Sequence, residues 1–224
     1  MTFDLAFRLT EILLAWAFLQ QSMEHLKTCQ SGRSIFMLRM FLSGLLIFNI
    51  FIPFICLALL GTSLFLLHKY DGPYNGGSDR MGILILICLT ISHFIPQTRE
   101  YVFGYLALQL ILSYVIAGIV KLRNPEWRNG QALRDVFEFS SYPMTEDLRI
   151  LAQKPRLLFV ASWAVILFEI FFPLSLITQE TLLIGLGLAA FFHLANAVLF
   201  GLNRFFWVWI AAYPTLIWFQ DRIF

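Results

Sequence analysis

The stretch YVIAGIVKLRNPEWRNG, residues 114–130, changes abruptly from apolar to polar residues. Its apolar run ends on Lys121, and Asn124, Pro125 and Glu126 follow closely. Asparagine before proline is typical of a helix N-cap followed by the first helical position, and an acidic residue is favoured in the first turn. The stretch therefore predicts that a long apolar helix ends near Lys121 and that a short helix runs from Pro125 to about Phe137.

The composition of the whole chain predicts a membrane protein. Of its 224 residues, 59% are hydrophobic and 13% are charged, whereas soluble proteins carry about 25% charged residues. The net charge is +2, so no basic surface for nucleic acid is expected, and the many aromatic residues suit a bilayer and its interfaces. Nucleic-acid binding is excluded as a function class.

The apolar segments of the chain predict an all-α, polytopic membrane helix bundle of about 6–8 spans. A spanning helix needs about 20 apolar residues, and such segments lie near 3–20, 35–68, 80–96, 101–121, 156–177, 181–200 and 204–219. Short surface helices are expected in the 122–155 connection. Without an internal repeat or a flexible linker, residues 1–224 are predicted to form one transmembrane domain, and the N-terminal stretch is interpreted as a retained helix rather than a signal peptide.

The segment 35–68 is too long for one upright span. Either it forms a tilted helix kinked at Pro53 with an interfacial lead-in, which we prefer, or it forms two short helices. Basic residues in 121–156 and in the first loop both favour the cytoplasmic side, which is incompatible with an odd number of spans between them. Two spans in 35–68 would remove that conflict, so sidedness stays open.

Two polar connections interrupt the apolar pattern. In the first, Gly- and Asn-rich turn sequence leads to Ser78 or Asp79, either of which is predicted to cap the next span. In the second, a further short helix is expected after residues 142–143, capped by Thr145. The helix after Pro125 is predicted to lie on the membrane surface, because charged residues alternate with its apolar positions Trp127, Ala132, Leu133 and Phe137.

Ionisable residues inside predicted spans are functional hypotheses by default, because a charge in the bilayer core costs about 2.5–3.5 kcal/mol on insertion scales. Arg8 and Glu11 are three residues apart and are expected to pair on one helical face. His93 is interpreted as an interfacial residue. No metal site is expected, since the four histidines are scattered and the three cysteines lack close spacing.

Four polar residues lie in the second half of the chain. Glu169 must be neutral or paired, with Arg8, Lys121 or His193 as its partner. His193 and Asn196 share one helical face, where they either hold helices together or bind the polar group of a ligand. Lys121 is either an anchor that reaches toward the membrane surface or a general base at the edge of a low-dielectric site.

Two motifs resemble a known family. YVIAGIVKLRNPEW and FFHLANAVLFGLNRF are similar, in order and separation, to stretches of the vitamin K-dependent γ-glutamyl carboxylases, and YNGGSDRMGIL precedes a span as in the wider horizontally transferred transmembrane (HTTM) family. The resemblance implies that Lys121 acts as a strong base toward a reduced quinone. It also implies that His193 and Asn196 line the same central cavity.

The resemblance has departures. Gly77 aligns with a carboxylase histidine that is implied in hydroquinone deprotonation, and no large extramembrane domain follows the spans before Phe224. Carboxylation of protein glutamates is therefore not expected.

Two hypotheses of function remain open. In the first, a polar cavity opens toward residues 122–155 and binds a quinone-like or lipid-like molecule, with Lys121 and His193 as catalytic residues and Asn196, Glu169 and Trp127 as ligand-binding residues. Its chemistry would be base-assisted and redox-linked. In the alternative, the chain is a non-catalytic membrane subunit or scaffold, and residues 35–68 and the aromatic stretch RFFWVWIAAYPTLIWF bind a protein partner.

Overall fold

The computed structural model describes residues 1–28, 32–69, 77–139 and 146–223. These residues are almost entirely helical and contain no strand, which confirms the predicted all-α class. They form two compact units. The first unit comprises residues 1–107 and 204–224, and the second comprises residues 108–203.

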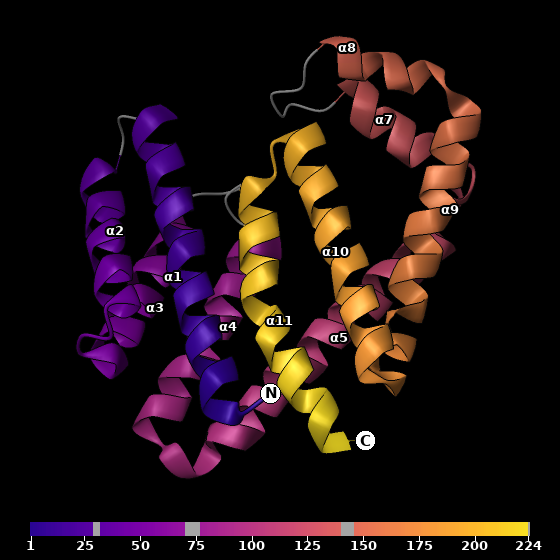
Figure 1. Ribbon diagram of the computed structural model, residues 1–224. Helices are drawn as coiled ribbons and strands as arrows, with labels where there is room; N and C mark the ends of the chain where they lie inside the picture. Colours follow the sequence, from indigo (N-terminus) through magenta and orange to yellow (C-terminus); the bar gives the residue numbers. More distant parts are fainter. Residues whose placement is uncertain (29–31, 70–76, 140–145, 224) are drawn as a thin grey trace. The chain divides into compact units, whose positions relative to one another are not determined.

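The first unit is a set of long helices joined by short connections (Figure 1). Helix α1 packs against α2, α2 against α3, and α3 against α4. The helices of this unit are α1 (Phe3–Thr28), α2 (Arg33–Ile47), α3 (Ile52–Lys69), α4 (Gly77–Phe94), the 3-10 helix η2 (Pro96–Thr98), the first part of α5 (Arg99–Arg123) and α11 (Asn203–Ile223).

The preferred prediction of one helix over 35–68 is wrong, because α2 and α3 are separate helices. The chain turns at residues 48–51, where Asn49 and Phe51 have φ of 63° and 48°. Asparagine tolerates this left-handed conformation, but a helix cannot continue through it. Pro53 is the second residue of α3, where its missing N–H removes no helical hydrogen bond. Pro53 therefore begins a helix instead of kinking one.

An aromatic core connects α1, the start of α5 and α11 within the first unit. The Phe103 ring lies 5.4 Å from Phe3, 5.5 Å from Phe7 and 5.4 Å from Trp218, measured between centroids. Such tilted and edge-on pairs add about 0.5–1.5 kcal/mol each to the burial of their surface. Because these helices are distant in the sequence, this core fixes the N-terminal helix against the C-terminal one.

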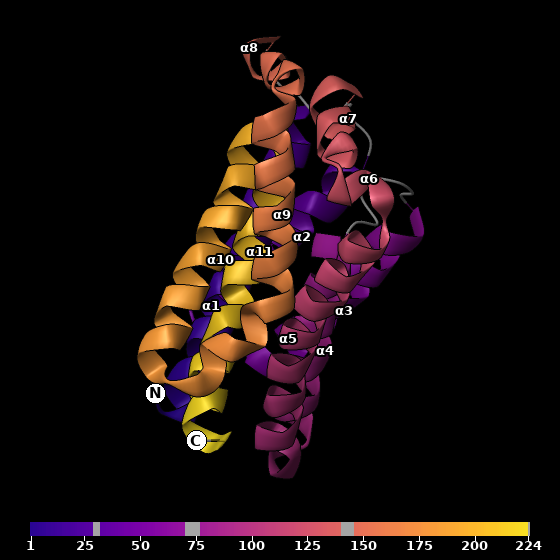
Figure 2. The same ribbon diagram turned by 90° about the vertical axis from the view of Figure 1, so that its right-hand side faces the viewer.

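The second unit is built on the rest of α5, α9 (Pro155–Phe171) and α10 (Gln179–Phe200) (Figure 2). The 3-10 helix η4 (Phe172–Ile177) reverses the chain between α9 and α10. Thr178 caps α10 by accepting a hydrogen bond from the Thr181 backbone N–H, and the Thr181 hydroxyl accepts in return from Thr178 N. This reciprocal cap fixes the start of α10.

The connection between α5 and α9 contains the predicted short helices. They are α6 (Pro125–Arg128), α7 (Gln131–Phe139), α8 (Glu146–Arg149) and the 3-10 helix η3 (Ile150–Gln153). Asn124 caps α6, since its side chain accepts from the Glu126 backbone N–H at 2.9 Å. The single helix predicted over 125–137 is interrupted at Gly130, whose φ is +83°. The predicted cap Thr145 lies outside the described residues.

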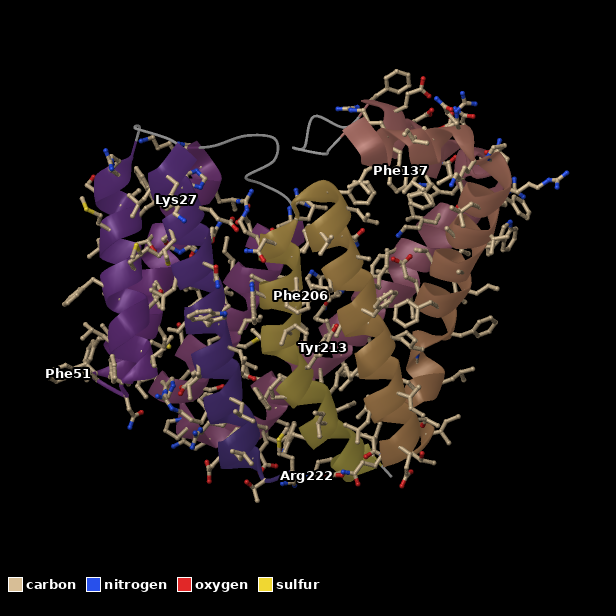
Figure 3. All side chains as sticks on the ribbon, turned by 45° about the horizontal axis from the view of Figure 1, so that its top comes forward. Lys27, Phe51, Phe137, Phe206, Tyr213 and Arg222 are labelled. Carbon is tan, nitrogen blue, oxygen red and sulfur yellow. The ribbon has the colours of Figure 1, made fainter. Side chains whose placement is uncertain are left out.

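Helix α7 was predicted to rest its apolar face on the membrane, but that face packs against the second unit itself. Phe137 is buried with Ala152, Leu158 and Phe200, and Leu133 packs against this cluster. Figure 3 shows Phe137 beneath α7. Alternating apolar and charged residues do not distinguish a membrane surface from a protein surface, because a helix buries its apolar stripe against either one.

The predicted cap of the third span is also wrong. Helix α4 begins at Gly77, so Ser78 and Asp79 are residues of its first turn. Asp79 accepts a hydrogen bond from the Gln21 side chain at 3.0 Å. An acidic side chain is favourable near a helix N-terminus without being its cap, which is why the sequence pattern resembled a cap.

Five helical segments in the described residues are long and apolar enough to cross a membrane. They are Ile52–Lys69, Gly77–Phe94, Pro96–Arg123, Pro155–Ile177 and Gln179–Phe200. Helices α1 and α11 have the length, at 26 and 21 residues, but are more polar. Helix α2 has 15 residues and is about 22 Å long, shorter than a bilayer core of about 30 Å.

The exposed surface of these segments is apolar. Large side chains such as Leu64, Ile116, Leu188 and Val198 are 48–70% exposed. An apolar surface of this extent is unusual for a protein in water but is the surface that lipid tails cover. The aromatic helix α11 differs, because Trp209, Tyr213 and Trp218 are buried along it.

Candidate functional site

The second unit holds a buried ion pair between Lys121 of α5 and Glu169 of α9. The Lys121 ammonium donates to both carboxylate oxygens, at 2.8 Å to Oε1 and 2.7 Å to Oε2. The lysine side chain is 17% exposed and the glutamate side chain 4%. Of the partners predicted for Glu169, Lys121 is therefore the one that pairs with it. Mutual neutralisation allows both groups to lie in apolar helices.

Helix α6 covers the pair from the surface. Lys121 Nζ lies 5.2 Å from the centroid of the Trp127 ring, within the range of a cation–π interaction. The Ser162 hydroxyl of α9 donates to the Trp127 carbonyl, and the Trp163 indole N–H donates to the Arg128 carbonyl at 3.0 Å. These bonds fasten α6 to α9. These contacts thus join Trp127, Lys121 and Glu169 into one group. Such contacts are what the prediction of a common site for the three residues required.

Gly118 permits the close approach of α5 and α9. It lies one turn before Lys121, and a Cβ atom at this position would be 2.7 Å from Ile170 Cγ1 and 2.9 Å from Ile170 N. Real Cβ atoms do not come so close, so a larger residue would push the helices apart. The sequence reasoning missed this role, although a glycine inside an apolar helix is a signal for close packing.

The Tyr114 hydroxyl lies 2.9 Å from His193 Nε2 and connects α5 to α10. Both residues are buried, at 2% and 3% exposed. The Tyr114 ring also packs on Phe172, with centroids 4.2 Å apart. Tyr114 was not predicted to be a site residue, although it begins the stretch that carries the family resemblance.

The predicted site residues therefore fall into two contact groups. Lys121 and Tyr114 are seven residues apart on α5, or two helical turns and about 10 Å. Asn196 is half-buried, and its side chain makes no hydrogen bond or ion pair within the described ranges. Its backbone carbonyl accepts from Gly201 N and Leu202 N, which ends α10. The contacts connect His193 to Tyr114, and Lys121 to Glu169 and Trp127.

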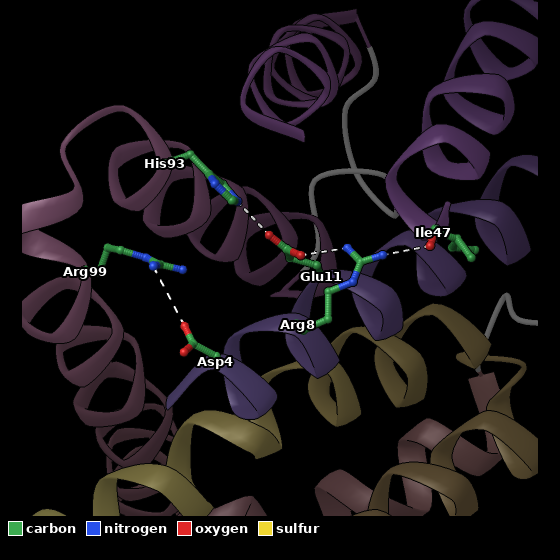
Figure 4. A network of polar contacts seen from close by, with 6 residues as sticks. All are labelled: Asp4, Arg8, Glu11, Ile47, His93 and Arg99. Carbon is green, nitrogen blue, oxygen red and sulfur yellow. Dashed lines mark hydrogen bonds and ion pairs between the residues drawn. The ribbon is translucent and has the colours of Figure 1, made fainter. Parts of the chain in front are cut away.

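A second polar network lies in the first unit (Figure 4). Arg8 donates to Glu11 at 2.7 Å and to the Ile47 carbonyl at 2.7 Å, which confirms the predicted Arg8–Glu11 pair. His93 Nε2 lies 2.6 Å from the other Glu11 oxygen, so His93 has a buried carboxylate partner that the sequence analysis did not anticipate. Arg99 lies 3.8 Å from Asp4 nearby.

Gly77 differs from the histidine that the carboxylases carry at the aligned position. A Cβ atom at Gly77 would lie 2.9 Å from Cζ of the Phe205 ring and 3.4 Å from Cε1. A histidine could enter only if that ring moved. The departure noted in the sequence therefore agrees with the local packing.

The fold and the buried polar groups define a multi-pass, all-helical integral membrane protein. The HTTM domain profile matches residues 94–221, more than half of the chain, and the protein belongs to the HTTM family. The match covers all of the second unit, including Lys121, Trp127, Glu169, His193 and Asn196. No curated protein and no solved structure shows a significant match to the chain. Among the described residues no cluster of three or more metal-ligating side chains is present.

Proposed function

We propose that Lys121, Glu169 and Trp127 form the polar end of a site for a small lipophilic molecule with a polar head, quinone-like or lipid-like. The observation that carries this proposal is the bidentate Lys121–Glu169 pair inside otherwise apolar helices. A charge pair in such surroundings is rarely retained for stability alone, since well-packed apolar residues would serve as well. Its position at the end of α5, under α6, suits a ligand whose head lies near the membrane surface.

Proton transfer within the pair is the step that would make Lys121 a base. When the proton moves from the ammonium to the Glu169 carboxylate, a neutral amine and a neutral acid result, and the total charge stays zero. Apolar surroundings favour this neutral pair, whereas the loss of one charge alone would leave the other charge buried without its partner. The neutral amine then accepts a proton from a hydroxyl group of the bound ligand.

A hydroquinone is the ligand for which this base would give redox-linked chemistry. Loss of the hydroxyl proton to Lys121 leaves a hydroquinone anion, and its oxidation requires an external electron acceptor such as dioxygen. His193, whose partner Tyr114 lies about 10 Å along α5 from Lys121, and Asn196 are proposed to bind a second polar group of the ligand in the same cavity. A lysine that acts as the base would make this chemistry similar to that of the carboxylases. In this proposal residues 1–224 act as one transmembrane domain.

The test is native mass spectrometry with lipid extraction on the mildly purified protein. Wild type is compared with Lys121→Ala, Glu169→Gln and His193→Ala, and Lys154→Ala is the matched control because Lys154 is exposed at the start of α9. A quinone or lipid that is lost in Lys121→Ala and His193→Ala but retained in Lys154→Ala supports the proposal. Equal ligand content in all variants contradicts it.

A non-catalytic subunit is the second candidate function, and the turn between α2 and α3 favours it. Phe48, Phe51 and Phe54 are 76%, 75% and 64% exposed at this turn, and Figure 3 shows Phe51 projecting outward. Of the aromatic residues of α11, which were expected to contact the same partner, three are buried and the others are half-buried. A stoichiometric polypeptide that co-purifies with wild type and Lys121→Ala, but not with Phe51→Ser, would favour this function.

A further inference from the structure

The first unit contains a buried arginine that has no counter-ion in direct contact among the described residues. Arg39 of α2 is 3% exposed, and its guanidinium carbon lies 4.0 Å above the Phe18 ring. Its Nε has no hydrogen-bond partner, and no carboxylate of the described residues forms an ion pair with it. A buried charge without a partner is costly, and the cation–π contact offsets only part of that cost.

A small cavity lies against this arginine. Its volume is about 20 Å³, which is enough for a water molecule or an atom of similar size. Four polar side chains and four apolar ones line it: Gln21, Arg39, Ser63, Asp79, Phe36, Leu66, Leu67 and Ile83.

The cavity lies close to the helix ends of the first unit. Arg39 is six residues from the start of α2, Leu67 is two from the end of α3, and Asp79 is two from the start of α4. Lys27, labelled in Figure 3, marks the same end on α1.

The carboxylate that lines the cavity is bound by other residues. Asp79 Oδ1 accepts from Gln21 at 3.0 Å, and Oδ2 faces Arg204 Nη1 at 3.9 Å. Among the described residues no ion pair joins Asp79 to Arg39. The Arg39 guanidinium is therefore the charge that an anion in the cavity would offset.

We propose that this cavity binds one small anionic group against Arg39, either a free monovalent anion such as chloride or one anionic oxygen of a lipid headgroup. A water molecule fits the same space but cannot offset the charge of Arg39, whereas an anion accepts from the guanidinium and offsets its charge. This site is separate from the Lys121–Glu169 pair and does not depend on the function proposed for that pair.

The experiment measures the Tm of the full chain in a maltoside detergent, which has no anionic oxygen, and in gluconate buffer, whose anion is too large for the cavity. Chloride or bromide replaces gluconate at constant ionic strength in one arm. Phosphatidylglycerol is added to the detergent in the other. A saturable rise in Tm is expected, because an anion that binds only the folded state stabilises it. A rise in the halide arm identifies a free ion, and a rise only in the lipid arm identifies a headgroup.

Arg39→Gln and Arg33→Gln are the matched variants, since both remove one positive charge from α2 and Arg33 is exposed. In Arg39→Gln the anion concentration needed for half of the effect should rise roughly ten- to a hundredfold, as for a lost hydrogen bond to a charged group. Arg33→Gln should behave as wild type. An equal loss in both variants would show a general surface effect and overturn the proposal.

If Arg39→Gln does not fold, measurements on the wild-type protein alone test the proposal. Broadening of the ³⁵Cl NMR line by the protein, reversed by bromide, or a rise in Tm with phosphatidylglycerol would support the site. A wild type that gives neither response contains only water in this cavity, and the proposal fails.

Discussion

Glu11 in the first unit and Glu169 in the second are both buried carboxylates, but they are stabilised in different ways. Glu11 interacts with two residues, Arg8 three positions earlier on the same helix and His93 on α4. Among the described residues Glu169 bonds only to Lys121, 48 residues earlier in the chain, and through both oxygens. A charge with several partners is suited to holding helices together, whereas a single isolated pair can exchange its proton. This difference is the reason why Glu169, and not Glu11, belongs to the proposed site.

The largest expected effect comes from removing the carboxylate charge of Glu11. Glu11→Gln removes the buried charge that faces Arg8 and replaces one of the two acceptor oxygens by an NH2 group, so it should lower the free energy of unfolding by about 3 kcal/mol. Glu169→Gln should cost less, about 1–2 kcal/mol, because Lys121 is near the end of α5 and its ammonium can reach the surface. Thermal and denaturant unfolding in detergent, followed by tryptophan fluorescence, measures both.

Glu100→Gln is the control for these variants, since Glu100 forms an exposed pair with Arg222 at 3.3 Å and should contribute less than about 1 kcal/mol. If Glu169→Gln destabilised the protein more than Glu11→Gln, the Lys121–Glu169 pair would be the stronger structural contact. The contrast between the two carboxylates would then be wrong.

The next largest effect should follow from enlarging Gly118. Gly118→Ala places a methyl group 2.7–3.0 Å from Ile170 and Glu169, so α5 and α9 must separate, at a cost of about 1–3 kcal/mol for overpacking. Separation should also lengthen the Lys121–Glu169 contact and reduce ligand retention. Gly187→Ala is the control, because a Cβ there meets nothing within 4 Å and alanine favours a helix. Equal stability of both variants would contradict the close approach.

A smaller effect is expected at the contact between α5 and α10. Tyr114→Phe removes the hydroxyl that bonds His193 and should cost about 1 kcal/mol, the usual contribution of one hydrogen bond. A double-mutant cycle with His193→Phe should give a coupling energy of about 0.5–1 kcal/mol. A coupling energy near zero would mean that the two side chains do not interact, and His193 would then be available to a ligand.

The smallest effect should come from the cap of α6. Asn124→Ala removes the side-chain acceptor of the Glu126 N–H and should cost about 0.5–1 kcal/mol. Because α6 covers Lys121 through Trp127, the expected consequence is faster hydrogen exchange in residues 125–130 with little change in the global Tm. Asn124→Asp retains the acceptor and should exchange as wild type does. A large fall in Tm for Asn124→Ala would show that α6 supports the whole unit.

The sequence by itself determined the membrane class and, outside the 35–68 segment, the long helices and their approximate ends. These features depend on local quantities: apolar length, caps such as Asn124, and the composition of each segment. The Arg8–Glu11 pair was predictable for the same reason, since residues three apart on a helix are neighbours. The two motifs around Lys121 and His193 also identified the family that the profile match confirms.

Only the tertiary structure decided which distant residues meet. Glu169 had three candidate partners in the sequence, and the approach of α5 to α9 at Gly118 selects Lys121. Three further contacts also depend on how the helices pack. They join His93 to Glu11, Tyr114 to His193, and the apolar face of α7 to Phe200. Apolar periodicity shows which face of a helix is buried, but it does not show which surface that face packs against. The partner of a buried charge follows from how the helices pack.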